Sequence, residues 1–284
     1  MPDKPKITII TAVHNGLAYN KLFYEALEKY TFNSFELIII DNASTDGSRE
    51  YFESQKHTVV IKNEVNYSYP YCQNQGIAIA KADYLFFLNN DLIVSSAWDK
   101  KLISISQLHG LDIISAAGIE NVGNRKDTQQ LDRKWKRVKN PLSVFGFGRT
   151  NLLLMLKLMY GNWDRFCEKK YLKHGTRVVE GIVGNNVMMS RKALSALQGW
   201  DERIQAADWD IFITSKKRSK EVGDIKPCHI ALGVFIHHFV RMTVKYAVKP
   251  QPFADKHRLI DLHEKWTEQE IDEMHPNNKT IRKF

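Results

Sequence analysis

The chain has little cysteine and no long hydrophobic run. Its three cysteines, Cys72, Cys167 and Cys228, are odd in number, widely spaced and form no CxxC pair. This argues against a disulfide-framed secreted domain and favours a reducing cytoplasm. The longest aliphatic stretch, residues 152–156, ends at Lys157 and is far shorter than the ~20 apolar residues that cross a bilayer. We therefore expect no spanning helix and, since residues 1–4 lead directly into a predicted strand, no secretory signal.

Two common phosphate-binding loops are also missing. No GxGxxG follows the first predicted strand, and no GxxxxGK[ST] occurs anywhere in the chain. These absences argue against a dinucleotide-dependent dehydrogenase and a P-loop kinase. Without a glycine-rich cradle, a diphosphate ligand would need a divalent cation held by hard oxygen ligands, and Asp91 is placed to supply one.

Positive charge, in contrast, is abundant and uneven. The formal net charge is +9, and residues 121–150 hold eight basic side chains against two acidic ones, a local charge of +6. An anionic partner is expected near this segment, and anionic lipid headgroups and a diphosphate both qualify. The alternative is that the segment is simply a solvated basic loop without a partner. Nucleic acid is not expected, because aromatic interleaving is limited to Trp135 and no reader motif is present.

Hydrophobic periodicity predicts an α/β fold over the first 120 residues. Short apolar runs at residues 6–13, 35–40, 58–61, 84–88 and 112–117 alternate with helix-period segments, which is typical of strand–helix–strand units around a mainly parallel sheet. After residue 120 the pattern breaks. We predict a domain at residues 1–245 with an inserted basic and apolar segment at 121–180, followed by a C-terminal helical extension at 246–284.

The inserted segment has two open interpretations. Residues 151–160 are apolar almost all round a helix, which argues for burial in protein or in lipid. The segment at 145–160 is therefore a candidate for an acceptor-side or subunit contact, and equally for a peripheral element that lies on an anionic membrane.

Polar residues follow three of the predicted strands. His14 and Asn15 come after the first, Asp41 and Asn42 after the second, and residues 89–91, Asn-Asn-Asp, after the fourth. Because ligands of open α/β sheets bind beyond the carboxyl ends of the strands, these side chains are expected to line one polar crevice.

The same residues carry a family resemblance. The motifs TAVHN at 11–15, DNASTDGS at 41–48, NQG at 74–76, LNND at 88–91 and GWDE at 199–202 followed by DWD at 208–210 occur in the order seen in family 2 glycosyltransferases. Over about residues 5–245 the chain resembles that family, which implies a GT-A-type, Rossmann-like, mainly parallel sheet flanked by helices.

The resemblance implies a donor site and a metal site. Asp41 would accept a hydrogen bond from the base, uracil in many relatives, and the donor site would be formed by Thr11, Ala12, His14, Asn15, Asp41, Asn42, Asn74, Asn89 and Asn90. Asn89 and Asp91 would take the outer positions of the family's Asp-x-Asp motif and bind Mn²⁺ or Mg²⁺. Asn89 lacks the charge of the usual aspartate, so Asp91 would contribute most of the affinity. Structural alternatives stay open: Asp41 may cap its turn, and Asn66 and Asn74 may shape a loop.

The resemblance also implies a catalytic base. Asp208 matches the aspartate of the family's Glu-Asp pair, although Ala207 replaces the glutamate; its alternative is a favourable charge at a helix N-terminus, and Asp210 is the fallback base. Of the adjacent His237 and His238, which point to opposite faces of a strand, at most one can reach the metal. His237 is assigned to it, with a packed histidine as the alternative.

These expectations describe an inverting, metal-dependent glycosyltransferase. It would move a sugar from a nucleotide-diphosphate sugar, preferably a UDP-sugar, to a glycan or lipid-linked acceptor in cell-surface polysaccharide synthesis. It would work in the cytoplasm or peripherally on the inner face of the cytoplasmic membrane. The alternatives are a catalytically silent nucleotide-sugar or glycan-binding module and a sugar-phosphate nucleotidyltransferase, although the latter would want a glycine-rich basic loop that residues 14–17 do not provide.

Overall fold

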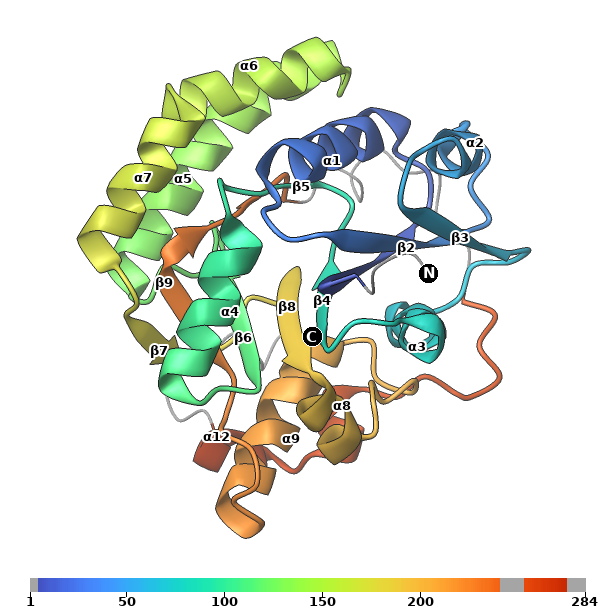
Figure 1. Cartoon of the computed structure of the whole chain (residues 1–284), viewed down its shortest axis with the longest axis vertical. Coiled ribbons are helices and arrows are strands. Elements are labelled where there is room, and N and C mark those ends of the chain that lie inside the picture. Colours follow the sequence, from blue (N-terminus) through green and yellow to red (C-terminus); the bar gives the residue numbers. More distant parts are fainter. Residues whose placement is uncertain (1–4, 241–252, 275–284) are drawn as a thin grey trace.

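The computed structural model describes residues 5–240 and 253–274, and an eight-stranded mixed sheet forms its centre (Figure 1). The strands run in the order β3-β2-β1-β4-β8-β6-β9-β7. Their bounds are β1 (Ile7–Val13), β2 (Phe35–Asn42), β3 (Thr58–Asn63), β4 (Tyr84–Leu88), β6 (Ile113–Ala117), β7 (Val178–Glu180), β8 (Asn186–Ser190) and β9 (His229–Phe235). Neighbours pair in parallel except where β8 meets β4 and β6 and where β7 meets β9. The predicted α/β class with a mainly parallel sheet is confirmed.

Helices cover both faces of this sheet. They are α1 (Leu17–Tyr30), α2 (Ser48–Glu53), α3 (Tyr69–Ile79), α4 (Trp98–His109), α5 (Arg125–Leu142), the 3₁₀ turn η1 (Ser143–Phe145), α6 (Arg149–Tyr160), α7 (Trp163–His174), α8 (Arg191–Leu197), α9 (Ala207–Glu221), α11 (Leu262–Lys265) and α12 (Glu268–Met274). Along β2, Leu37 and Ile39 point into one core, with α1, α4 and α5–α7, while Ile38 and Ile40 point into the other, with α3, α8, α9, α11 and α12. Successive side chains of a strand alternate between faces, so a strand buried on both faces reads as a continuous apolar run.

A two-stranded sheet lies beside the main one. β5 (Leu92–Ile93) pairs antiparallel with β10 (His237–His238), so that His238 stands opposite Leu92 and His237 opposite Ile93. The sequence analysis did not predict this pairing, because a two-residue strand carries no periodic signal. It brings the end of the β9 segment to the residue that follows Asp91.

The inserted segment forms a layer of three helices. α5, α6 and α7 form an outer arch next to α1 and β9 (Figure 1). The predicted strand and turn at 178–189 is two separate strands, β7 and β8, joined by the loop 181–185. Within the described residues, no helix is both long and apolar enough to span a membrane.

The C-terminal residues 262–274 pack against α9. Trp266, Ile271 and Met274 belong to the same core as Ile211 and Phe212, while the Nζ of Lys265 and the Nε1 of Trp266 both donate to Asp210. The predicted boundary at 245–246 lies outside the described residues.

Candidate active site

One edge of the sheet collects the polar residues that the motifs predicted. Strands β1, β2 and β4 end there, and β8 begins there because it runs antiparallel, with Asn186 opposite Leu88. The loop Gly184–Asn185 therefore joins the edge although it lies about 95 residues after β4 in the sequence. In the parallel pair of β1 and β2, Val13 is opposite Asp41.

Asp41 is fully buried at this edge and has one unused oxygen. Its Oδ2 accepts from Nε of Arg49 at 2.7 Å, whereas its Oδ1 has no hydrogen-bond partner within the described residues. A buried carboxylate oxygen left unpaired is costly. Asp41 is thus an acceptor whose missing donor can come from a ligand, such as an N–H of a nucleotide base.

Asn15 and His14 tie the turn after β1 to the turn after β2. The backbone N–H of Asn15 donates to Oγ of Ser44 at 2.8 Å, and its side-chain oxygen accepts from the N–H of Thr45 at 2.8 Å. Nδ1 of His14 lies 2.7 Å from the carbonyl oxygen of Asn42. These contacts hold the two turns together. Thr11 is buried, its hydroxyl has no hydrogen-bond partner in the part of the chain that the structure describes, and Ala12 is half-buried.

Asn42 and Asn74 are fully occupied by structural bonds. The Nδ2 of Asn42 donates to Asn66 and to the carbonyl of Tyr67, and its Oδ1 accepts from Asn63 and from the N–H of Tyr67. Asn74 makes the same kind of clamp with both backbone groups of Trp200 and with Glu202. An amide side chain has two N–H hydrogens to donate and one oxygen to accept, so little hydrogen-bonding capacity is left for a nucleotide sugar. These bonds fit the loop-shaping alternative for Asn74 and show the same kind of structural role for Asn42, while donor contact by either residue stays a prediction.

Asp91 follows β4 at the same edge of the sheet and is buried. Asn89, which is half-buried, is held through its backbone N–H by the carbonyl of Asn185 at 3.0 Å, and Asn90 donates to Asn20 at 2.7 Å. Asn20 in turn bonds Ser48 and the carbonyl of Asn15. Hydrogen bonds thus connect the turns after β1, β2 and β4 along one edge.

His238, and not His237, is the histidine beside Asp91. Its Nε2 lies 3.2 Å from Oδ1 of Asp91, and its Nδ1 contacts Glu120 and, at 3.1 Å, Nδ2 of Asn185. Burial alone would lower the pKa of His238, but the charges of Asp91 and Glu120 outweigh it and raise this pKa to about 10. The imidazole therefore carries a positive charge between two carboxylates.

His237 faces the hydrophobic core instead. Its Nδ1 lies 2.8 Å from the hydroxyl of Tyr160, and its ring packs edge-on against Trp135 and Phe239. Full burial lowers the pKa of His237 well below its ordinary value. His237 thus fits the packed-histidine alternative: adjacent strand residues point to opposite faces, and His238 is the one beside Asp91.

The residues around Asp91 fit a cation that also binds a diphosphate. Among the residues that the structure describes, no group of three or more His, Cys, Asp and Glu side chains is arranged to hold a metal by itself. A Mg²⁺-type cation on a nucleotide needs only one or two carboxylates, since phosphates and water supply the rest. Asp91 offers such a carboxylate, with Asn89 and His238 beside it. His238 would have to lose its proton to become a ligand.

Asp208 begins α9 and reaches the same edge. Its Oδ1 accepts from the N–H of Trp209 at 2.9 Å, and its carboxylate fills the space over Gly184, where a Cβ atom would lie 2.1 Å from Oδ2. Gly184 directly precedes Asn185, which contacts His238. Burial raises the pKa of Asp208, while the bond from Trp209 opposes this. Asp208 contacts this loop directly, and Asp91 is linked to it through His238.

Asp210 cannot serve as the fallback base. It is buried and bound by Lys265 at 2.8 Å and by the indole N–H of Trp266 at 2.7 Å. Its carboxylate anchors the C-terminal helices. Sequence reasoning missed Asn185, Glu120 and Arg49; only Arg49, which lies in the helix that follows the Asp41 turn, had a local signal.

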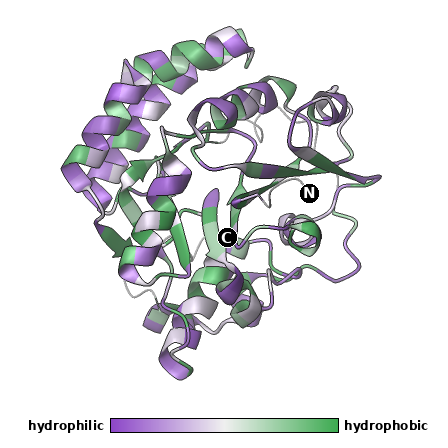
Figure 2. Ribbon diagram, in the orientation of Figure 1, coloured by the Kyte–Doolittle hydropathy of each residue, from purple (hydrophilic) through white to green (hydrophobic). Residues whose placement is uncertain are grey.

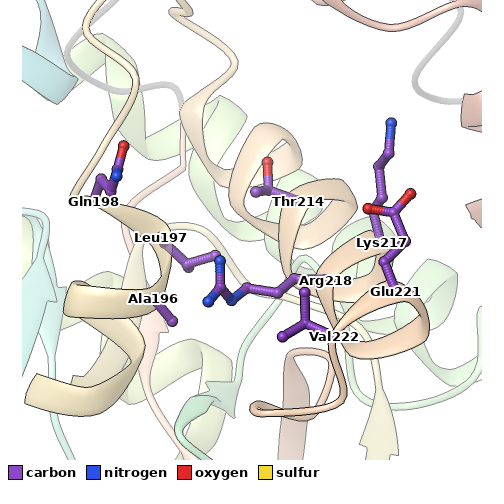
Figure 3. Close-up of a pocket in the computed structure, with 8 residues that line it drawn as sticks. All are labelled: Ala196, Leu197, Gln198, Thr214, Lys217, Arg218, Glu221 and Val222. Atoms are coloured by element: carbon purple, nitrogen blue, oxygen red, sulfur yellow. The ribbon is translucent and has the colours of Figure 1, made fainter.

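A groove elsewhere on the molecule does not belong to this site. It has a volume of about 320 Å³ and lies between α8 and the second half of α9, lined by the residues in Figure 3. Two of its charged residues are paired: Arg218 with Asp224 and Lys217 with Glu270. Asp208 is in the first turn of α9, away from the groove.

Known proteins resemble this chain in sequence and in fold. Residues 8–197 match the model of the family described as Glycosyl transferase family 2. The glycosyltransferase GlyG of Streptococcus pneumoniae is 28% identical over 112 residues, which cover 38% of this chain and 37% of that protein. The O-antigen chain rhamnosyltransferase WbaN of Salmonella anatum is 29% identical over 91 residues, covering 31% and 29%. The matched segments thus span well under half of these relatives.

One solved structure is similar at low sequence identity. It is a mannosyltransferase from Pyrobaculum calidifontis, determined in complex with GDP-Man and Mn²⁺. The identity is 12%, the TM-score is 0.49, and the alignment covers 81% of this chain and 58% of that one.

Proposed function

The chain belongs to glycosyl transferase family 2, and on this premise we propose that it moves a sugar from a nucleotide-diphosphate sugar to a hydroxyl of a glycan or of a lipid-linked saccharide. The pathway would be the synthesis of a cell-surface polysaccharide, and the matched O-antigen rhamnosyltransferase supports this acceptor class. The three buried free thiols are compatible with work in the cytoplasm.

The observation that carries the proposal is that Asp208 and His238 contact adjacent residues of one loop. Asp208 fills the space over Gly184, and the following residue, Asn185, lies 3.1 Å from His238, which is the neighbour of Asp91. One short loop thereby links a candidate base to a cluster suited to a leaving diphosphate. Such an arrangement serves a displacement in which an alcohol enters as a diphosphate leaves.

The nucleotide end of the donor is assigned to Asp41. Its unpaired, fully buried Oδ1 accepts an N–H of the base, and the N3–H of uracil satisfies this requirement. Because Arg49 already holds the other oxygen, the carboxylate is fixed in place before the donor arrives. A UDP-sugar is therefore the favoured donor.

The diphosphate end is assigned to Asp91 together with Asn89 and His238. Mn²⁺ or Mg²⁺ bound there would neutralise the charge of the departing diphosphate. Glu120 orients the imidazole of His238 by accepting from its other nitrogen, Nδ1. Such outer partners fix the direction in which a metal-binding histidine points.

Asp208 is assigned as the general base. It takes the proton of the acceptor hydroxyl while that oxygen bonds to the anomeric carbon, and the bond from this carbon to the diphosphate oxygen breaks with its electron pair. One direct displacement inverts the anomeric configuration. A carboxylate whose pKa is raised by burial is a stronger base than an ordinary aspartate.

Ligand-dependent stability tests this assignment. A ligand that binds only the folded state raises the melting temperature, so UDP with Mn²⁺ is expected to stabilise the protein more than UDP or Mn²⁺ alone. GDP with Mn²⁺ is the comparison for the base. The Asp91→Ala variant is expected to lose the Mn²⁺-dependent part of the shift, whereas the surface control Asp224→Ala keeps it.

Donor hydrolysis completes the test. Metal-dependent release of UDP from a UDP-sugar by the wild-type protein supports a transferase. Binding of UDP without any turnover, in a panel of sugars and acceptors, would instead indicate a silent binding module. An unchanged shift in Asp91→Ala would remove Asp91 from the cation site.

A further inference from the structure

The inserted helices expose large apolar side chains to solvent. Val144 and Phe145 of η1 are 80% and 79% exposed, and Leu153, Leu154 and Leu158 of α6 are 39%, 42% and 54% exposed. We call these five residues the apolar rim. Figure 2 shows hydrophobic segments along α6, which lies at the outer edge of the molecule. Several large apolar side chains exposed on two consecutive elements mark a candidate interaction site.

The leucines of the rim lie on one outward face of α6. Residues 150, 153, 154, 157 and 158 are all exposed and fall at the i, i+3, i+4, i+7, i+8 spacing of a single helix face. The opposite face is also apolar: Leu152, Met155, Leu156 and Met159 are buried against the protein. The inward face already anchors the helix, and among residues 5–240 and 253–274 nothing covers the outward leucines.

Charge indicates which partner fits. Residues 133–163 contain no Asp or Glu and seven cations: Arg133, Lys134, Lys136, Arg137, Lys139, Arg149 and Lys157. Lys136 and Arg149 make surface ion pairs with Asp132 and Glu25, and Arg133, Arg137 and Lys157 are exposed. Lys157 lies among the leucines of the outward face. Apolar side chains beside lysine and arginine match the acyl boundary and the headgroups of an anionic lipid surface.

The rim is connected to the active site. The ring of Phe147, two residues after Phe145, lies 6.3 Å from that of Tyr19, and a Cβ atom at Gly16 would lie 3.3 Å from Cδ2 of Tyr19 and 3.6 Å from Nδ2 of Asn90. At the other end of α6, Tyr160 contacts His237, the neighbour of His238. A surface seated on the rim would therefore lie close to the crevice.

We propose that the apolar rim and its flanking cations dock the protein on an anionic phospholipid surface, where a lipid-linked acceptor meets the active site. The acceptor part rests on the proposed function. The docking part rests only on exposed residues outside the crevice.

Vesicle co-sedimentation tests the docking. The full chain is mixed with vesicles of phosphatidylcholine containing phosphatidylglycerol, and with vesicles of phosphatidylcholine alone. Binding is expected to the anionic vesicles, to weaken with salt, and to be much weaker for the neutral ones. Equal binding to both compositions, or to neither, would overturn the proposal.

Two sets of variants separate the apolar and the charged contributions. The double variant Phe145→Ser/Leu158→Ser is expected to bind anionic vesicles roughly tenfold more weakly, because two apolar side chains no longer enter the interface. Its control is Leu108→Ser/Val222→Ser, which changes two residues of similar exposure, 65% and 60%, on α4 and at the end of α9. The double variant Arg133→Gln/Arg137→Gln is expected to lose roughly tenfold for anionic vesicles only.

Two further measurements keep the outcomes distinct. If the rim is instead an interface between two copies of this chain, light scattering will show a dimer that Phe145→Ser/Leu158→Ser converts to a monomer, without vesicle binding, and the proposal fails. Donor hydrolysis without vesicles is expected to be unchanged in all rim variants. Donor hydrolysis without vesicle binding would contradict the docking proposal alone. Vesicle binding without donor hydrolysis would contradict the proposed function alone.

Discussion

The turns after β1 and β2 hold their polar side chains in hydrogen bonds to one another, whereas a cluster of charged side chains lies where β4, β8 and β10 meet. On the first side, Asn15, Asn42 and Asp46 each bond two or more backbone or side-chain groups of a neighbouring loop. On the second side, Asp91, Glu120 and His238 form a charge cluster, and the loop 184–185 links it to Asp208. The first side is held by internal hydrogen bonds, with Oδ1 of Asp41 unpaired among the described residues, and the second holds groups whose charge can change during a reaction.

This difference predicts which property each side controls. Substitutions in the turns after β1 and β2 should act on folding stability, because the bonds they remove are internal. Substitutions around Gly184 and His238 should act on turnover or on metal affinity with a smaller effect on stability. The predictions below compare the two sides, beginning with the largest effect.

Gly184→Ala is expected to lower the transfer rate by roughly 100-fold, because a misplacement of about 1 Å in a reacting group costs this much. The added Cβ would lie 2.1 Å from Oδ2 and 2.4 Å from Cβ of Asp208, so the carboxylate must move. The matched control is Gly148→Ala, since no atom of the described residues lies within 4 Å of a Cβ at that position. Steady-state kinetics of both variants measure the effect, and an unchanged rate for Gly184→Ala would separate Asp208 from the reaction.

His238→Gln is expected to reduce the affinity for Mn²⁺ in the presence of UDP by about 10–100-fold, the usual cost of disturbing the surroundings of a metal site. His237→Gln is its matched control, because this neighbour contacts Tyr160 and Trp135 and lies on the opposite face. Calorimetric titration of Mn²⁺ into both variants gives the comparison. Equal losses in the two would contradict the assignment of His238 to the crevice.

Asn42→Ala is expected to lower the free energy of unfolding by about 2 kcal/mol, because four hydrogen bonds of a buried amide are lost and their partners stay buried. Asn140→Ala, at an exposed position of α5, is expected to change it by less than about 0.5 kcal/mol. Urea unfolding measures both. A stable Asn42→Ala protein with lost donor binding would keep Asn42 in the donor site.

The smallest predicted effect is a pH dependence at Asp208. Burial raises the pKa of Asp208 in the folded state. Its protonated form therefore stabilises the fold at a pH below the ordinary pKa of aspartate. This contribution is lost as the pH rises through the pKa of the folded state, above which the buried carboxylate is ionised. Asp208→Asn is therefore expected to be more stable than the wild type at neutral pH. The difference should shrink as pH falls and disappear below the ordinary pKa of aspartate. Thermal unfolding across pH tests this, and a less stable variant at neutral pH would contradict it.

Much of the fold could be predicted because local signals were strong. The runs that became β1, β2 and β4 are apolar on both faces, and the stripe of α1 has a clear helical period. β5, β10 and the split between β7 and β8 could not be predicted, since two- and three-residue strands are specified by their long-range pairing rather than by periodicity.

The candidate site was predicted in part for the same reason. Asp41, Asp91 and Asp208 follow recognisable motifs, and the structure connects them to one edge. The hydrogen bonds of Asn42 and Asn74 are made to loops far away in the sequence, namely 63–67 and 199–202. The motif alone therefore could not tell whether these side chains hold the loops or contact a ligand. The choice between His237 and His238 depended on the pairing of β10 with β5, which no residue near the two histidines indicates.

Single-turnover sugar transfer by Asp208→Asn tests the central claim, that a base and a diphosphate-binding cluster share one loop, most directly. Wild-type protein and variant are loaded with a UDP-sugar and Mn²⁺ and mixed with acceptor, and donor affinity is measured in parallel by calorimetry. The account predicts a transfer rate lower by roughly 10²–10⁴-fold with donor affinity unchanged and, for the wild type, a product of inverted anomeric configuration. A variant that transfers sugar at the wild-type rate, or a product of retained configuration, would contradict it.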